Sequence, residues 1–136
     1  TEIKATLRAA RNCNPKKIYA IFQPHRYTRT QLLAEEFGAA FIDADEVIVT
    51  SIYSAGEQPI KGVSSALIID SLKRNGKNVV FIEKKEDIVD YILDRAMPGD
   101  YILTIGAGDI NKIAYNIADK LEACPKEVIG EFREVN

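Results

Sequence analysis

The chain has 136 residues, a formal net charge of −2, 46% hydrophobic residues and 28% charged residues, which suits one globular domain with its own core. The slightly acidic balance argues against a nucleic-acid or membrane-surface partner, because such partners favour a basic face. No apolar run approaches the ~20 residues of a membrane span, and no signal-peptide pattern opens the sequence. We therefore expect a cytoplasmic protein.

Alternating apolar runs and helical periodicities organise the chain. The first predicted helix covers residues 2–11, with Ile3, Leu7 and Ala10 on one face and Thr1 as its N-cap. Further helices are predicted at 30–41, 64–74, 85–96 and 110–123, and strands at 18–22, 46–51, 79–82 and 101–105. Strand and helix alternate throughout, and the strands are continuous apolar runs. This pattern predicts an α/β, three-layer Rossmann-like domain with a mostly parallel sheet and helices on both faces.

A dense run of cations follows the first predicted strand directly. The segment from Gln23 to Thr30 contains the only histidine of the chain, His25, and two arginines, Arg26 and Arg29. It lies between the carboxyl end of a strand and a helix amino terminus, where open α/β sheets bind ligands and free N–H groups favour an anion. The alternative, a solvated polar loop, does not explain why three potential cations gather there in an acidic chain. We therefore interpret the run as an anion site, since a guanidinium pairs with carboxylate or phosphate oxygens.

Two further loops are predicted at the same edge of the sheet. In the second, from Tyr53 to Gly62, Glu57 is the one acid. In a functional interpretation, Glu57 orients Arg26 and Arg29 or accepts a hydrogen bond from a substrate ammonium. In a structural interpretation, it only caps the helix at Ser64 or pairs with a surface cation. Both interpretations stay open. Ser64 and Ser65 are expected as helix caps rather than nucleophiles.

The third loop, Gly106-Ala107-Gly108, precedes Asp109, an expected N-cap. A phosphate or amino acid fits against such glycines, but helix–strand packing needs the same residues. Tyr27, Tyr53 and Tyr101 are too scattered to form a stacking platform, so their spacing assigns them no chemistry.

Other site types find little support. Cys13 and Cys124 show no metal-ligand spacing, and one histidine does not suit a zinc site, so we expect free thiols and no metal site. The chain contains no Gly-x-x-x-x-Gly-Lys phosphate loop, so it should not hold ATP by itself.

The three loops together resemble a known family. The segments 22–30 (FQPHRYTRT), 52–60 (IYSAGEQPI) and 99–110 (GDYILTIGAGDI) resemble loops of the C-terminal domain of the Mur ligases, most closely the members that add L-alanine to UDP-N-acetylmuramate. Thr1-Glu2 is similar to the end of the hinge that precedes this domain, so we expect a fragment beginning at a domain boundary. The resemblance covers residues 1–122. The tail, 123–136, carries no motif to which we assign a role.

The resemblance implies a function. In Mur ligases the first domain holds a UDP-sugar, the central domain holds ATP and magnesium, and the third closes over both and admits the amino acid. ATP converts the sugar carboxylate to an acyl phosphate, which the incoming amine attacks during peptidoglycan precursor synthesis. By resemblance this chain is the third domain, inactive alone. Its implied catalytic residues are His25, Arg26 and Arg29, and its implied substrate-binding residues are Arg29, Tyr53, Ala55, Gly56, Glu57, Gly106 and Gly108.

Three alternatives remain at this point. One is a related Mur-type ligase that adds murein tripeptide, which the intact His-Arg-Tyr-Thr-Arg run disfavours. A second is a non-catalytic α/β anion-binding module, and a third is a structural or interaction domain, which predicts no anion affinity in the loops.

Overall fold

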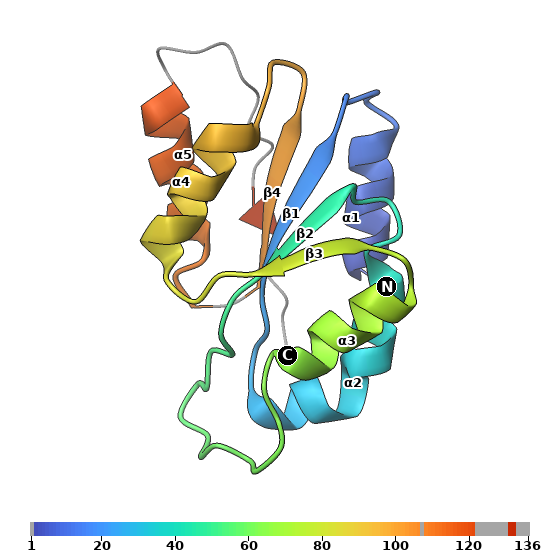
Figure 1. Cartoon of the computed structure of the whole chain (residues 1–136), viewed down its shortest axis with the longest axis vertical. Helices are drawn as coiled ribbons and strands as arrows, with labels where there is room; N and C mark the ends of the chain where they lie inside the picture. The colour runs from blue at the N-terminus through green and yellow to red at the C-terminus, as the bar shows by residue number, and fades with distance from the viewer. Residues whose placement is uncertain (1, 107, 122–130, 133–136) are drawn as a thin grey trace.

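A five-stranded parallel sheet forms the middle layer of the molecule (Figure 1). The computed structural model describes residues 2–106, 108–121 and 131–132. The strand order is β3-β2-β1-β4-β5, and all four pairings are parallel. The strands are β1 (Ile18–Gln23), β2 (Glu46–Val49), β3 (Asn78–Phe81), β4 (Tyr101–Gly106) and β5 (Glu131–Phe132). The helices are α1 (Glu2–Arg11), α2 (Tyr27–Ala40), α3 (Ala66–Arg74), α4 (Lys85–Arg95) and α5 (Asn111–Leu121).

Side-chain alternation along the strands builds a hydrophobic core on each face of the sheet. In β1, Ala20 and Phe22 belong to the core cluster shared with α1, α2 and α3, whereas Tyr19 and Ile21 belong to the cluster shared with α4 and α5. Figure 1 shows the corresponding layers, with α4 and α5 on one side of the sheet and the other three helices opposite. The predicted three-layer parallel α/β domain is therefore confirmed.

The edge strand β3 departs from the expected burial. All six residues of β1 are buried, but in β3 none is, and Phe81 is 44% exposed. The apolar run at 79–82 predicted the strand correctly. An edge strand has a neighbouring strand on one side only, so its side chains are less covered than those of a central strand.

Two helix starts differ from the predictions in ways that matter for the site. Helix α2 begins at Tyr27, three residues before the predicted start at Thr30, so Arg29 lies in its first turn and not in a loop. Helix α5 begins at Asn111, so Asp109 lies before the cap position. The predicted cap at Thr1 and the predicted helix end at Ala123 fall outside the described residues.

The tail supplies a strand that the sequence did not predict. Strand β5 pairs in parallel with β4, with Thr104 opposite Glu131 and Ile105 opposite Phe132. A two-residue strand is too short for apolar alternation to indicate it. The tail therefore extends the sheet beyond β4.

The three loops of interest lie together because β1 pairs with both β2 and β4. The carboxyl ends of these strands meet at the lower edge of the sheet in Figure 1, and the register places Gln23 of β1 opposite Gly106 of β4. Strand order reverses between β1 and β4, which is the position where open α/β sheets bind ligands. Within the described part of the chain, no helix is long and apolar enough to cross a membrane.

Candidate functional site

The first and second loops are joined by a short backbone ladder beyond the sheet. The Arg26 N–H donates to the Tyr53 carbonyl and the Tyr53 N–H donates to the Pro24 carbonyl, both at 2.8 Å, so His25 pairs with Tyr53 as a parallel bridge. The two rings stack, with centroids 5.9 Å apart and planes 14° from parallel. His25 is thereby buried at 8% exposure, while Tyr53 stays 42% exposed. The scattered tyrosines gave no signal for this pairing, because it depends on the register of two loops.

Arg26 stands at the N-cap of α2 in an uncommon backbone conformation. Its φ is 70° and its ψ is 145°, a region that residues with a side chain avoid. Such strain costs about 1–3 kcal/mol and persists only where the surroundings impose it. Two hydrogen bonds hold Arg26 in this conformation. Its N–H donates to the Tyr53 carbonyl, and its carbonyl accepts the Thr30 hydroxyl, both at 2.8 Å. The Arg26 side chain is exposed to solvent at the start of the helix.

Glu57 occupies the amino terminus of α2. Its Oε1 accepts the N–H groups of Tyr27 (2.7 Å) and Thr28 (3.2 Å), and its Oε2 accepts the Thr28 hydroxyl (2.5 Å). These hydrogen bonds, led by that from the Thr28 hydroxyl, lower the pKa of Glu57. The expectation of free N–H groups for a ligand at this helix start is therefore wrong for Tyr27 and Thr28. The capping role that the sequence offered for Glu57 is wrong in its location, because the helix that Glu57 caps is α2 and not the one after Ser64. Its implied role in substrate binding stays a proposal.

A tight turn directs Glu57 to this position. The Glu57 N–H donates to the Ser54 carbonyl at 3.0 Å, and the two central residues, Ala55 and Gly56, have φ values of 51° and 89°. Two consecutive positive φ values are typical of a type I′ turn, which glycine adopts without strain. Ala55 and Gly56 therefore shape the second loop, and their implied role in substrate binding remains a proposal.

Arg26 and Arg29 line one hollow on the surface of α2. It measures about 370 Å³ and is completed by Thr28, Leu32 and Leu33. The Arg29 guanidinium lies 6.0 Å from the Phe37 ring centroid, so the half-buried side chain runs along the helix toward its third turn. The structure thus brings both arginines to one hollow, as expected for residues three positions apart at a helix start.

A larger pocket of about 510 Å³ lies between the second loop and α3, with Tyr27 in its wall. None of its lining residues is charged, so its walls offer no side-chain charge to pair with an anion. The Ser64 hydroxyl at its rim accepts the Ala66 N–H at 3.1 Å, which confirms a capping role for Ser64. The Ser65 hydroxyl instead donates to the Thr50 carbonyl at 2.6 Å, so Ser65 ties the end of β2 to α3 and does not cap the helix.

The third loop approaches the first two through its glycines. Gly106 has φ +134°, and a Cβ there would lie 2.3 Å from the Gln23 carbonyl oxygen. Gly108 has φ +73°, and a Cβ there would lie 3.2 Å from the Tyr53 ring and 3.4 Å from Gln23 Oε1. Gly106 is therefore required by the close approach of β4 to β1, and Gly108 packs against side chains of the first two loops. Neither contact is the helix–strand packing that the sequence suggested, and the implied role of both glycines in substrate binding stays a proposal.

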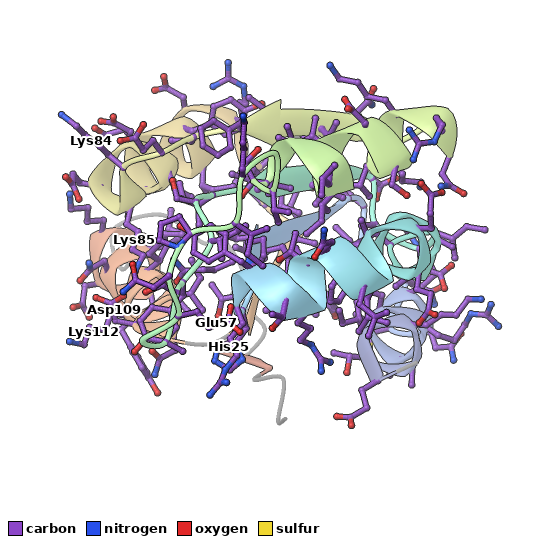
Figure 2. All side chains as sticks on the ribbon, turned by 90° about the horizontal axis from the view of Figure 1, so that it is seen from below. His25, Glu57, Lys84, Lys85, Asp109 and Lys112 are labelled. Carbon is purple, nitrogen blue, oxygen red and sulfur yellow. The ribbon has the colours of Figure 1, made fainter. Side chains whose placement is uncertain are left out.

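Asp109 holds the third loop to α4. Its carboxylate forms an ion pair with Lys85, the first residue of that helix, and this hydrogen bond lowers the pKa of Asp109. Figure 2, which looks onto this edge of the sheet from below, shows the pair to one side of His25 and Glu57. The expected N-cap role is wrong because α5 begins two residues later, at Asn111.

The site residues do not fit a resident metal or a phosphate loop. Among the described residues no group of three histidine, cysteine or acidic side chains is placed to hold a metal ion. Cys13 is an exposed free thiol, and Cys124 lies outside the described residues. What the described residues offer to an anionic ligand is therefore the guanidinium groups of Arg26 and Arg29.

Comparison with known proteins decides the family. Residues 1–108 match the model of the family described as "Mur ligase, glutamate ligase domain". The chain belongs to the Mur ligase family. The resemblance noted in the three loops is thereby confirmed over most of the chain.

Curated members of the Mur ligase family match at high identity. A UDP-N-acetylmuramate–L-alanine ligase from Pelotomaculum thermopropionicum is 50% identical over 123 residues, and one from Brachyspira hyodysenteriae is 48% identical over 123 residues. Each match covers 90% of this chain and 27% of the relative. The chain thus spans about a quarter of the length of these ligases.

A solved Mur ligase domain shares the fold. It is a domain from a candidate UDP-N-acetylmuramate:L-alanyl-γ-D-glutamyl-meso-diaminopimelate ligase of Haemophilus ducreyi, with a TM-score of 0.60 and 21% identity. The match covers 88% of this chain and 81% of that domain. At this identity the similarity establishes the fold alone.

Proposed function

We propose that this chain is the amino-acid-admitting domain of a cytoplasmic, ATP-dependent ligase that joins L-alanine to UDP-N-acetylmuramate through an acyl phosphate. The observation that carries the proposal is the match to L-alanine ligases at 42–50% identity over 83–95% of the chain. The convergence of the three loops at the switch point supports it, because a ligand there contacts all three. The nucleotide and magnesium would be held mainly outside this chain.

Arg26 and Arg29 supply the positive charge for this chemistry, and His25 supplies an imidazole next to Arg26 in the chain. The carboxylate of L-alanine pairs with Arg29, whose planar fork matches two carboxylate oxygens. Arg26 and His25 face the phosphate side, where negative charge gathers as the acyl phosphate forms and breaks down. Because Glu57 already occupies the Tyr27 and Thr28 N–H groups, this stabilisation falls to side chains rather than to the helix terminus. The strained Arg26 backbone fixes where its side chain leaves the helix.

A competition assay tests the proposed substrate. The full-length protein that carries this chain would receive UDP-N-acetylmuramate, ATP, Mg²⁺ and equal concentrations of L-alanine and L-alanyl-γ-D-glutamyl-meso-diaminopimelate. Mass spectrometry should find the L-alanine adduct, with ADP formed in equal amount. A product that contains only the tripeptide would assign the chain to the other ligase type. Tight anion binding without any product would favour the non-catalytic module.

A further inference from the structure

The second loop holds the backbone of Arg26 on both sides. The N–H of Arg26 donates to the Tyr53 carbonyl at 2.8 Å, and the next N–H along the chain, that of Tyr27, donates to Glu57 Oε1 at 2.7 Å. These two N–H groups stand at the two ends of the backbone rotations of Arg26, which have a φ of 70° and a ψ of 145°. Two contacts from one loop therefore fix both torsions of an exposed cation.

Arg26 does not keep this conformation by local preference. A residue with a side chain seldom adopts a positive φ, because its Cβ crowds the neighbouring backbone. Arg26 also makes no capping hydrogen bond with its own side chain, so the first N–H groups of α2 depend on an acceptor from elsewhere. Strain of this kind persists only where the surroundings impose it, and it gathers at functional sites. Glu57 is part of what imposes it here.

A tight turn sets the spacing of the two contacts. Tyr53 and Glu57 lie on either side of this turn, in which the Glu57 N–H donates to the Ser54 carbonyl at 3.0 Å. On the helix side, Glu57 Oε1 also accepts the Thr28 N–H, and Oε2 accepts the Thr28 hydroxyl at 2.5 Å. Figure 2 shows Glu57 beside His25 at the start of α2. The second loop and the start of α2 thus form one hydrogen-bonded unit.

We propose that Glu57 is a positioning residue, which holds Arg26 toward the transferring phosphate through the backbone of α2 and does not itself contact the substrate. The inference rests on the proposed function, which assigns Arg26 to the phosphate. A cation that is already in place stabilises developing negative charge better than one that must first move there. Three hydrogen bonds occupy the Glu57 carboxylate, which accepts about four in total, so little capacity is left for a substrate ammonium.

Two other roles compete with positioning: Glu57 binds the amine of the substrate directly, or it only stabilises the fold. Variants of the full-length enzyme separate these roles. Glu57→Ala removes all three hydrogen bonds. Glu57→Gln keeps an oxygen for the Tyr27 and Thr28 N–H groups and turns its amide to the Thr28 hydroxyl, which also accepts. Gly76→Ala is the control for stability, since it strains a turn with φ +74° at the opposite end of the sheet, before β3.

The decisive measurement is a double-mutant cycle between Glu57→Ala and Arg26→Ala. Steady-state kinetics would vary L-alanine at saturating ATP and UDP-N-acetylmuramate, well below the melting temperature of every variant. Glu57→Ala should lower kcat about ten- to a hundredfold, the loss expected when a catalytic group is misplaced by about 1 Å. The KM for L-alanine should change less than about twofold, because Arg29 lies further along α2 and is held against Phe37.

The other variants have their own expected results. In the Arg26→Ala background, Glu57→Ala should change kcat less than about twofold, because no positioned charge is left to misplace. Glu57→Gln should recover most of the kcat that Glu57→Ala loses. Gly76→Ala should keep kcat within about twofold of the wild type.

Each of the following outcomes would overturn the proposal. Losses in kcat that multiply in the double variant would show that Glu57 acts independently of Arg26. Equal losses in Glu57→Gln and Glu57→Ala, with a raised KM for L-alanine, would assign Glu57 to the substrate amine. A kcat in Glu57→Ala no lower than in Gly76→Ala would leave only a role in stability. A wild-type enzyme that does not ligate L-alanine would instead overturn the proposed function, and the Glu57 proposal with it.

Discussion

Replacing Gly106 with alanine tests whether the site depends on the close approach of β1 and β4. Gly106 lies opposite Gln23 with φ +134°. An added Cβ would be 2.3 Å from the Gln23 backbone carbonyl oxygen and 3.2 Å from its backbone nitrogen. These neighbours are backbone atoms, so they cannot move aside as a flexible side chain can. Gly106→Ala must therefore separate the carboxyl ends of the two strands.

The cost has two parts that the chain allows us to separate. A residue with a side chain in an unfavourable positive-φ conformation costs about 1–3 kcal/mol, and overpacking a tight contact adds about 1–3 kcal/mol. Together Gly106→Ala should lose about 2–6 kcal/mol, a large share of a typical stability of about 5–15 kcal/mol. Gly76, with φ +74° and no atom within 4 Å of its Cβ position, is the control. Gly76→Ala carries only backbone strain and should lose about 1–2 kcal/mol.

Urea unfolding of the 136-residue chain, followed by circular dichroism, measures both losses. We expect the unfolding midpoint to fall in both variants and much further in Gly106→Ala, with similar m-values. If Gly106→Ala were no less stable than Gly76→Ala, the tight contact between β1 and β4 at this edge would be refuted.

Three further predictions follow from the site. Glu57→Gln should lower thermal stability at neutral pH. The difference from wild type should shrink as the pH falls below 4.5, because the folded-state pKa of Glu57 lies below that ordinary value. Melting curves that show the same difference at every pH would contradict this prediction. Arg29→Ala in the full-length enzyme should reduce kcat/KM for L-alanine about ten- to a hundredfold. It should also lower the free energy of unfolding by about 0.5–1 kcal/mol, because the contact with Phe37 is lost. Unchanged alanine kinetics would remove the role assigned to Arg29. The isolated chain should show neither ligation nor ATP hydrolysis above blank, since it lacks a phosphate loop, and clear turnover would overturn its assignment as one domain of a larger enzyme.

The sequence predicted the three layers and the edge of the sheet where the candidate site lies, because both depend on strongly apolar strands. It placed the start of α2 wrongly for a physical reason. The residue at the cap position is Arg26, which is not a capping residue type. The cap comes instead from Glu57, 30 positions beyond Tyr27. Residues so far apart in the sequence form no local pattern. The periodicity of apolar residues therefore cannot indicate a helix start that depends on such a contact.

Two features of the candidate site were missed for similar reasons. The His25–Tyr53 pair depends on two loops continuing the β1–β2 pairing beyond the strands. The buried amide of Gln23 was visible only as a polar residue ending an apolar strand, and a loop position outside the sheet explains that pattern equally well. By contrast, the sequence singled out His25, Arg26 and Arg29 as candidates because their residue types and their place after a strand are both local features.

The most direct test of the proposed phosphate role is the kinetics of Arg26→Ala and Arg26→Lys in the full-length enzyme, with each substrate varied in turn. If Arg26 contacts the transferring phosphate, Arg26→Ala should lower kcat more than it raises KM for L-alanine, because the contact strengthens as charge develops. Arg26→Lys should recover only part of the loss, since an ammonium cannot span two oxygens in a plane. A wild-type kcat in Arg26→Ala, with both parameters within about twofold as for a surface substitution, would contradict a catalytic site at this edge of the sheet.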